Sequence, residues 1–325
     1  MNLSRRQFGI AATGSALALS GREAAADDFP TRPVTLIVPW AAGGPTDIVL
    51  RAMGEVAQKK LGQPVIIDCR AGGGGTVAPS VMAATAKPDG YTITQIPDSV
   101  YRMYLMQQTT YHPRDDFTYI INLSGYAYAL IVPADSPFKT WQDVLDFARG
   151  NPGKLTVGTP GAGSSHHIGI GRIMKESGIK LVHVPFKGGA EVNTAVAGGH
   201  VMMGGSGTSA KPLAEGGKVR FIQIWTKKRL ATLPNVPTLR ECGYPFEIES
   251  PIGLAGPKGM DPKVVARLHD AFKAALDDPG VNDVLRKYEL LVNYMSGDDY
   301  RGYVASQMQT ELAVFKDIGL ARAGL

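Results

Sequence analysis

Short apolar runs alternate with amphipathic helical stretches along this chain, and this alternation limits the fold more than any other feature. Val34–Val38, Val65–Cys69 and Tyr91–Ile96 have the length of strands, and residues 46–60 and 77–86 between them have helical periodicity. Strands that alternate with helices form β-α-β units and a largely parallel sheet. We therefore predict one open α/β sheet in the first hundred residues.

A second set of the same kind follows the apolar run Leu130–Val132. Residues Thr140-Trp141-Gln142-Asp143 form a capping box that opens a helix ending near Gly150. Further strands are expected at 155–158, 181–184 and 219–225. From Pro251 the chain is predicted to form one more strand and then helices, the last over residues 298–318. About 300 residues exceed what one hydrophobic core usually organises, so we expect two α/β domains.

The first 26 residues have the pattern of an export signal. Arg5 and Arg6 precede an apolar run, and Ala24-Ala25-Ala26 form a cleavage site of the A-x-A kind. Ser-Arg-Arg-x-Phe is also the pattern of a twin-arginine signal, although an ordinary secretory signal with two arginines remains the alternative. In either case we expect a soluble mature protein in the periplasm.

Charge and cysteine content exclude several classes of partner. The full chain has 34 basic and 29 acidic residues, and removal of residues 1–26 leaves 31 and 28, a net charge of +3. This balance is too weak to indicate nucleic acid and is compatible with an anionic ligand. Cys69 and Cys242 are expected to be isolated thiols; a disulfide between them is the alternative in an oxidising compartment.

Two loops that follow predicted strands are candidates for ligand binding. The first runs from Trp40 through Gly43 and Gly44 to Asp47, and lies between a strand and a helix. Ligands bind at this position in open α/β sheets, where a helix N-terminus offers unpaired N–H groups and partial positive charge. The alternative is a tight turn in which Thr46 or Asp47 caps the helix.

The second loop, from Thr159 to His167, repeats this design with hydroxyl groups added. One loop from each domain would allow both to face a ligand across a cleft. Gly74, in the run Gly72–Gly75 after the second strand, is a third position for backbone contact. Arg102 follows the third strand and is a candidate for a bidentate carboxylate contact.

Motifs for nucleotide binding, metal binding and catalysis are missing from the sequence. The glycine runs lack the spacing of a P-loop or of a dinucleotide-binding turn. His166 and His167 are adjacent and so lie on different faces of a helix, and no paired C-x-x-C occurs. The run from Gly204 to Thr208 fails the G-x-S-x-G pattern at its last position. We therefore expect no cofactor, no metal, no nucleic acid and no enzymatic activity.

Five motifs in order carry a family resemblance that covers nearly the whole mature chain. They are Pro33 to Asp47, Leu61 to Val65, Lys87 to Tyr91, His183 to Gly188, and Leu233 to Thr238. With these motifs the chain resembles the Bug-type receptors, the periplasmic substrate-binding proteins of tripartite tricarboxylate transporters. The resemblance implies a two-domain periplasmic binding protein (type II-like, Venus flytrap) that holds a carboxylate in the cleft between its domains.

The resemblance also implies a domain layout and a site. Residues 27–131 and 250–325 would form the first domain and residues 132–249 the second, because the family returns its C-terminal helices to the first domain. Hinge segments are expected near 131–133 and 249–251. Together with the residues found above, the predicted ligand-binding set is Trp40, Ala41, Ala42, Gly43, Gly44, Thr46, Asp47, Gly74, Arg102, Gly161, Ser164, Ser165, His166, His167 and Ser206.

One segment departs from the family pattern and bears on the ligand. Many relatives have two acidic residues where this chain has Met202 and Ser206, which argues against an amino-acid ligand. Gly204 and Gly205 are expected to leave space, and His166 replaces a smaller residue. Together these features favour a bulkier carboxylate, either a dicarboxylate or an aromatic one.

Three functions remain open from the sequence. The first is a monomeric receptor that delivers a small organic carboxylate to the membrane permease subunits of a tripartite tricarboxylate transporter. The second is a receptor that presents its ligand to a sensor kinase. The third, an envelope hydrolase, is disfavoured because no nucleophile motif is present.

Overall fold

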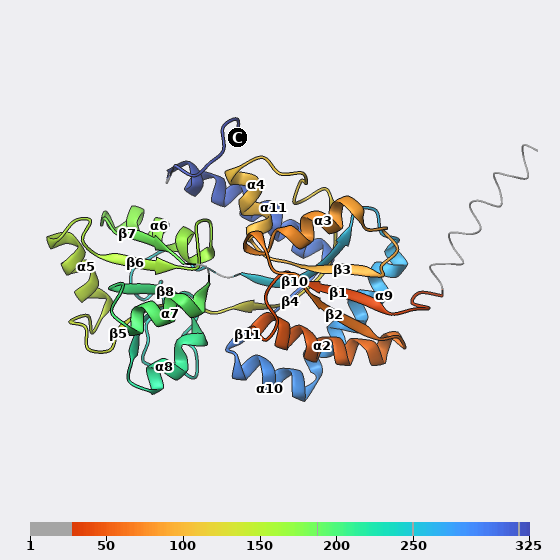
Figure 1. Ribbon diagram of the computed structural model, residues 1–325, viewed down its shortest axis with the longest axis horizontal. Helices are drawn as coiled ribbons and strands as arrows, with labels where there is room; N and C mark the ends of the chain where they lie inside the picture. Colours follow the sequence, from red (N-terminus) through yellow and green to blue (C-terminus); the bar gives the residue numbers. More distant parts are fainter. Residues whose placement is uncertain (1–27, 187, 249, 318) are drawn as a thin grey trace, which may run out of the picture.

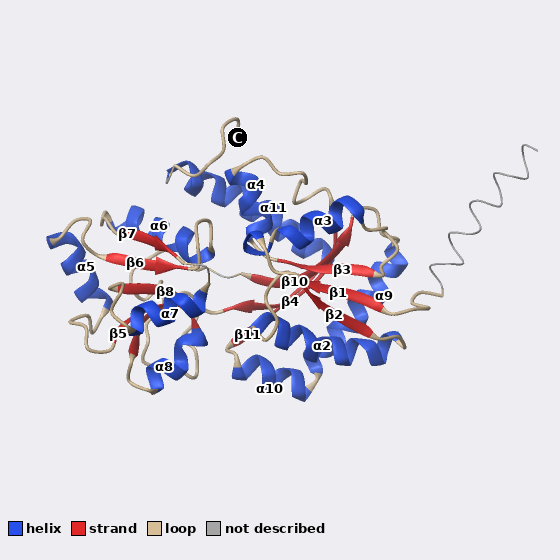
Figure 2. Cartoon of the chain, viewed as in Figure 1, coloured by secondary structure: helices blue, strands red, loops and turns tan. Residues whose placement is uncertain are grey.

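The computed structural model describes residues 28–186, 188–248, 250–317 and 319–325. Two separate sheets, each with helices on both faces, lie next to each other along the long axis of the molecule (Figures 1 and 2). This arrangement confirms the predicted two-domain α/β fold. The predicted signal peptide, residues 1–26, lies outside the described residues.

The first sheet has six strands in the order β11-β4-β10-β3-β1-β2. Strand β1 is parallel to β2 and β3, whereas β10 is antiparallel to β3 and β4, and β11 is antiparallel to β4. The strands are β1 (Val34–Val38), β2 (Val65–Cys69), β3 (Thr92–Ile96), β4 (Phe117–Tyr126), β10 (Pro251–Pro257) and β11 (Leu290–Ser296). The predicted parallel part of this sheet, β1 to β3, is confirmed.

Helices cover both faces of the first sheet and form two cores with it. On one face lie α2 (Pro45–Leu61), α9 (Pro262–Lys273) and α10 (Pro279–Lys287), packed through residues such as Leu50 and Phe272. On the other face lie α3 (Val77–Thr85), α4 (Ser99–Met106) and α11 (Gly297–Asp317), packed through residues such as Tyr101 and Tyr300. Short 3-10 turns occur at η1 (Gly73–Gly75) and η3 (Ala274–Asp277).

The second sheet has five strands in the order β7-β6-β8-β5-β9. These are β5 (Tyr128–Pro133), β6 (Thr156–Thr159), β7 (Val182–Pro185), β8 (Met203–Gly207) and β9 (Val219–Ile224). Helices α5 (Trp141–Gly150) and α6 (Ser165–Ser177) pack on one face through residues such as Ile173. Helices α7 (Gly189–Ala197) and α8 (Lys211–Glu215), with η2 (Thr208–Ala210), lie on the other face, where Val192 is buried.

Local sequence explains where key helices begin and end. Proline occupies the first position of α2, where its missing N–H costs no hydrogen bond, and Gly62 ends the helix with a left-handed φ of 73°. At α5 the capping box is confirmed: the Asp143 N–H donates to Thr140 Oγ1 (3.3 Å), and Asp143 Oδ2 accepts from the Thr140 N–H (2.8 Å).

The chain passes between the two sheets in two places. Strand β4 ends at Tyr126 in the first sheet, and β5 begins at Tyr128 with all of its partners in the second sheet. The predicted boundary after residue 131 is therefore wrong by a few residues, because it cuts through β5. The exchange, by which we mean the point where the chain crosses from the first sheet to the second, lies at Ala127. The chain returns to the first sheet at Pro251, where β10 begins.

The last three helices pack on the first sheet, as the resemblance implied. In addition, the C-terminal end of α11 reaches the second domain. There Phe315 is buried in one cluster with Leu105 of α4 and Ile168 of α6. The two domains are therefore in contact through this helix as well as through the connecting strands (Figure 1).

Candidate functional site

The loop between β1 and α2 is braced by its own aspartate. Asp47 is 3% exposed, and its Oδ2 accepts the N–H of Gly43 (2.8 Å). Its Oδ1 accepts from Arg51 Nε (2.7 Å) and from the thiol of Cys69 (3.2 Å). Burial opposes ionisation, but these donors outweigh it and lower the pKa of Asp47. The predicted ligand contact by Asp47 is therefore not supported: its carboxylate shapes the loop and Gly44 takes the N-cap position.

The outer part of this loop is open to solvent. Ala41, Ala42 and Gly43 are exposed, and the left-handed φ of Gly43 (81°) turns the chain into α2. Trp40 is half-buried, and its indole N–H donates to Gln95 Oε1 (2.9 Å). Since these three small residues leave the helix N-terminus uncovered, the loop retains the form of an anion-binding turn.

The glycine run after β2 packs beneath Trp40. A Cβ atom at Gly75 would lie 3.0 Å from the Trp40 ring, so only glycine allows this approach. The left-handed φ of Gly74 (63°) is also suited to glycine, and its carbonyl oxygen accepts from Ser99 Oγ (2.6 Å) at the start of α4. This packing places Gly74 next to the first loop, and its contact with a ligand remains a prediction.

The loop between β6 and α6 uses its hydroxyl groups internally. Ser164 is the N-cap of α6: its Oγ accepts the N–H of His167 (3.2 Å) and donates to the carbonyl of Gly161 (2.7 Å). Ser165 Oγ is buried and accepts from Arg102 (2.6 Å). Both hydroxyls therefore hold the loop in place, and the unpaired N–H groups in the first turn of α6 are its remaining donors.

Two tyrosines that the sequence did not indicate connect the loops of the two domains. Tyr126 and Tyr128 flank the exchange at Ala127, keep part of their side chains exposed, and stack with ring centroids 6.1 Å apart. The Tyr126 hydroxyl bonds to Thr46 Oγ1 in the first turn of α2. The Tyr128 ring packs edge to face on His166 in the first turn of α6, 4.5 Å between centroids.

This chain of contacts brings the N-termini of α2 and α6 to one pair of phenols. Burial of the hydroxyl groups raises the pKa of Tyr128 to about 12 and that of Tyr126 further, so both remain neutral hydrogen-bond donors. Two helix N-termini and two phenol groups together favour an anion. A β-strand signal alone does not predict such a pair, because the tyrosines acquire their partners only through the packing of the two domains.

His166 fills the space that the glycines of β8 were expected to leave open. A Cβ atom at Gly205 would lie 2.7 Å from His166 Cβ, and one at Gly204 would lie 2.6 Å from Val196. The prediction of free space is therefore wrong, because side chains of α6 and α7 occupy it. Burial lowers the pKa of His166 to about 4, so the ring is neutral. Ser206 is fully buried and donates to Asn193, away from the loops.

Arg102 has a different role from the predicted one. Its Nε and Nη2 form a bidentate pair with Glu311 of α11 (2.7 and 2.6 Å), and Nη2 also lies 3.2 Å from Asp98. All three side chains are buried. The guanidinium therefore binds carboxylates of its own chain, and through Nη1 and Ser165 it links the two domains.

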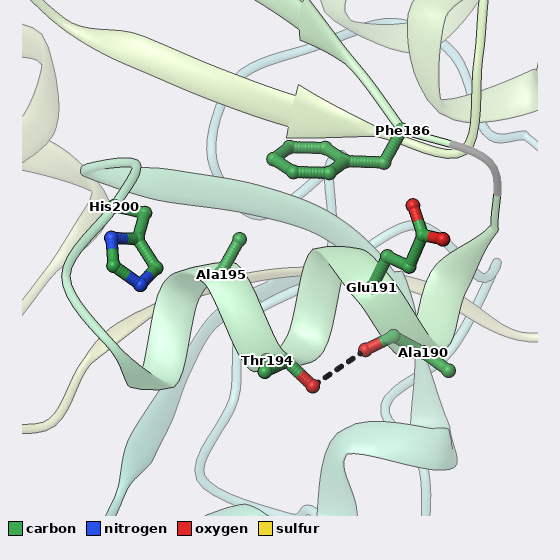
Figure 3. A pocket seen from close by; sticks show the side chains of 6 residues that line it. All are labelled: Phe186, Ala190, Glu191, Thr194, Ala195 and His200. Atoms are coloured by element: carbon green, nitrogen blue, oxygen red, sulfur yellow. Dashed lines mark hydrogen bonds between the residues drawn. The ribbon is translucent and has the colours of Figure 1, made fainter.

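Two hollows lie outside the loops. One, of about 420 Å³, lies on α7 and is lined by Phe186, Ala190, Glu191, Thr194, Ala195 and His200 (Figure 3). The carboxylate of Glu191 on its wall disfavours an anion there. The other, of about 170 Å³, adjoins the Arg102–Glu311 pair and Arg172 between the domains. Neither is lined by the residues of the two loops.

Within the described ranges, no group of three or more His, Cys, Asp or Glu residues is placed to hold a metal ion. Within those ranges, no helix has the length and apolar character required to cross a bilayer. Cys69 and Cys242 are both free thiols, as the sequence favoured.

Comparison with known proteins agrees with the fold. The profile of the tripartite tricarboxylate transporter family receptor matches residues 49–320. The "UPF0065 protein in gbd 5'region" of Cupriavidus necator is 42% identical over 99% of this chain and 100% of its own length. Protein BugT of Bordetella pertussis is 27% identical over 98% of this chain and 99% of its own length.

Solved structures give the same result. The periplasmic binding protein BugD superimposes with a TM-score of 0.79 at 28% identity, over 90% of this chain and 99% of that protein. A protein of R. palustris solved with adipate gives a TM-score of 0.81 at 29% identity, with the same coverage. MatC of Rhodopseudomonas palustris, solved with bound malate, gives 0.77 at 29% identity, over 88% and 99% of the two chains. The chain therefore belongs to the tripartite tricarboxylate transporter receptor family, as a solute-binding receptor and not an enzyme.

Proposed function

We propose that this protein is a monomeric periplasmic receptor that captures a small organic carboxylate, a dicarboxylate or an aromatic carboxylate, and delivers it to the membrane permease of a tripartite tricarboxylate transporter. One observation carries the proposal: the first turns of α2 and α6, one from each domain, contact the same pair of tyrosines. A ligand anion at this pair would receive hydrogen bonds from phenols and from helix N-termini of both domains.

The acidic side chains near the loops have cationic partners in the chain itself, which disfavours a cationic ligand. Asp47 is paired with Arg51, Glu311 is bidentate with Arg102, and Asp98 lies 3.2 Å from the same guanidinium. Two structural relatives were solved with adipate and malate, which are both dicarboxylates. A dicarboxylate has an anionic group for each helix N-terminus, and we therefore place C4 to C6 dicarboxylates first among the candidates.

A thermal-shift panel tests the ligand class. Dicarboxylates of four to six carbons, benzoate and phthalate are compared with sugars and with a diamine at the same ionic strength. A ligand at 100 times its Kd stabilises the folded state by about 2.7 kcal/mol, which raises the Tm of a protein of this size by about 5 °C. Stabilisation by sugars or the diamine, with none by any carboxylate, contradicts the proposal.

Tyr126→Phe locates the binding site. It removes a neutral donor from the shared pair, and loss of a hydrogen bond to a charged ligand costs about 1.5–3 kcal/mol of binding free energy. Tyr294→Phe is the matched control, because Tyr294 is exposed on the edge strand β11 and its hydroxyl bonds to His269 instead of to a residue of the two loops. Equal affinities of the two variants place the ligand elsewhere.

Uptake measurements test the transport role. Cells that lack this protein should lose uptake of the labelled carboxylate, and the wild-type protein should restore it whereas Tyr126→Phe should restore it poorly. Normal uptake combined with loss of the transcriptional response to the same carboxylate assigns the protein to a sensor pathway instead.

A further inference from the structure

We propose that His183 is a positioning residue of the ligand site: its ring, stacked on His167, holds the β6–α6 loop so that the Nε2–H of His167 donates to the ligand carboxylate. This inference rests on the proposed function for the identity of the ligand. It concerns a residue on β7 that lies outside both loops and outside the predicted ligand-binding set.

The two imidazole rings form a close parallel stack. Their centroids are 3.9 Å apart and their planes differ by 9°. His183 lies within β7, which is hydrogen-bonded to β6 in parallel register, whereas His167 lies in the first turn of α6. A rigid strand therefore supports a side chain at the N-terminus of the helix that follows the loop.

A chain of hydrogen bonds fixes the protonation of His183. Thr159 Oγ1 donates to the carbonyl of Gly161 (3.2 Å) and lies 2.6 Å from His183 Nε2. Because the threonine hydroxyl has only one hydrogen, His183 Nε2 is the donor in the second contact. The ring is thereby tied to the same carbonyl that receives the Ser164 hydroxyl.

The partner of His167 fixes its protonation in the same way. The N–H of Gly163 donates to His167 Nδ1 (3.1 Å), so the proton of the neutral ring lies on Nε2. Burial and then the neighbouring His183 lower the pKa of His167 to about 4, and the ring is neutral at pH 7. Its Nε2 has no hydrogen-bond partner among the described residues, which leaves this N–H for a ligand.

The loop requires such support because its two glycines make the backbone conformationally flexible. Gly161 and Gly163 have left-handed φ values of 106° and 74°, and glycine samples many other conformations at little cost. Without His183 the His167 ring is free to rotate, and Gly163 then loses its acceptor. The expected result is a loop that samples several shapes, of which only one presents the Nε2–H of His167.

Nuclear magnetic resonance tests the tautomer without any ligand. Long-range ¹H–¹⁵N spectra at pH 7 should show His167 as the Nε2–H tautomer in the wild type and as a mixture of tautomers in His183→Ala. His183→Phe keeps a planar ring for the stack and should retain the single tautomer. His200→Ala, at the end of α7 in the same domain, is the control. An unchanged His167 spectrum in His183→Ala overturns the proposal.

A double-mutant cycle tests whether His183 acts through His167. Adipate is the probe, and calorimetry gives its Kd for the wild type, His167→Ala, His183→Ala and the double variant. We expect His183→Ala to weaken binding roughly tenfold in the wild type and to add less than about twofold in His167→Ala. Full additivity means that His183 acts independently and contradicts the proposal. Failure of the wild type to bind adipate counts against the proposed ligand class, while the tautomer spectra still decide the role of His183.

Discussion

Replacing Gly205 with alanine tests whether the His166 ring occupies the space beside β8. An added Cβ atom would lie 2.7 Å from His166 Cβ and 2.9 Å from its Cγ and Cδ2. Atoms at these distances overlap, and the Cβ–Cβ contact cannot be relieved by a rotamer change. Extra methyl groups in a packed core usually destabilise by about 1–3 kcal/mol, and we expect Gly205→Ala to lower the free energy of unfolding by this amount.

Two substitutions of His166 distinguish the overlap with its ring from the overlap with its Cβ atom. His166→Ala removes the ring but keeps Cβ, so the loss caused by Gly205→Ala should be only partly reduced. His166→Gly removes all three contacts, and in that background Gly205→Ala should be neutral within about 0.5 kcal/mol. Gly204→Ala is the control, because its Cβ would meet Val196 and Val192 instead and no change at residue 166 should relieve it.

Urea unfolding followed by tryptophan fluorescence measures these differences. Trp225 lies 5.5 Å from the His166 ring, between centroids, and so reports on this region. If Gly205→Ala costs the same in His166→Gly as in the wild type, then the His166 ring does not fill the space beside Gly205. The space would in that case be available to a ligand, as the sequence alone suggested.

Three further predictions concern the contacts that hold the site. Glu311→Gln should lower the free energy of unfolding by about 1.5–3 kcal/mol, because the buried Arg102 loses the charge of one carboxylate partner and keeps Asp98; urea unfolding of this variant and of Glu215→Gln on α8 gives the comparison. Burial is the main cause that raises the pKa of Asp98 to about 6. The folded state therefore favours the protonated carboxyl group: the contribution of Asp98 to stability is fully present below about pH 4 and is lost as the pH rises through 6. Asp98→Asn should remove this loss in unfolding curves recorded across that range. Ser164→Ala should cost about 1 kcal/mol as a lost N-cap, and Ser164→Asn should restore most of it in the same assay.

The parallel part of the first sheet was predictable because its signals are local. The runs Val34–Val38 and Val65–Cys69 are apolar, of strand length and bounded by turn residues, and the structure has both strands with the same limits. The capping box at Thr140 was equally predictable, since all of its donors and acceptors lie within four residues. In each case the residues that determine the structure are neighbours in the sequence.

The exchange between the sheets was not predictable in this way. Residues 117–133 are rich in strand-forming side chains throughout, and nothing in them marks the change of sheet at Ala127. The partners of this segment, β10 and β11 on one side and β8 and β9 on the other, lie far along the chain. Strand pairing of this range is decided by tertiary packing and leaves no local signal.

In the candidate site, too, local features were predictable and long-range contacts were not. Local spacing predicted that each loop lies between a strand and a helix, as the structure has it. It also predicted that Asp47 and Arg102 bind the ligand, because the sequence does not show that other groups already bind them. The partner of Arg102 is Glu311, 209 residues away, and the fork geometry that suits a ligand carboxylate suits Glu311 equally well. An arginine in a predicted cleft is therefore weak evidence for a ligand contact until its charge partners are known.

We expect the tyrosine pair to link ligand binding to domain movement. Tyr126 ends β4 of the first sheet and Tyr128 begins β5 of the second, so any rotation of the domains about Ala127 changes the stack between them. Thr46 and His166 extend this pair to the first turn of a helix in each domain. A ligand shifts a conformational equilibrium only through its different affinity for the two states. Because the groups that would bind the anion lie on both sides of the exchange, only one relative orientation of the domains brings them all to the ligand, and binding must favour that orientation.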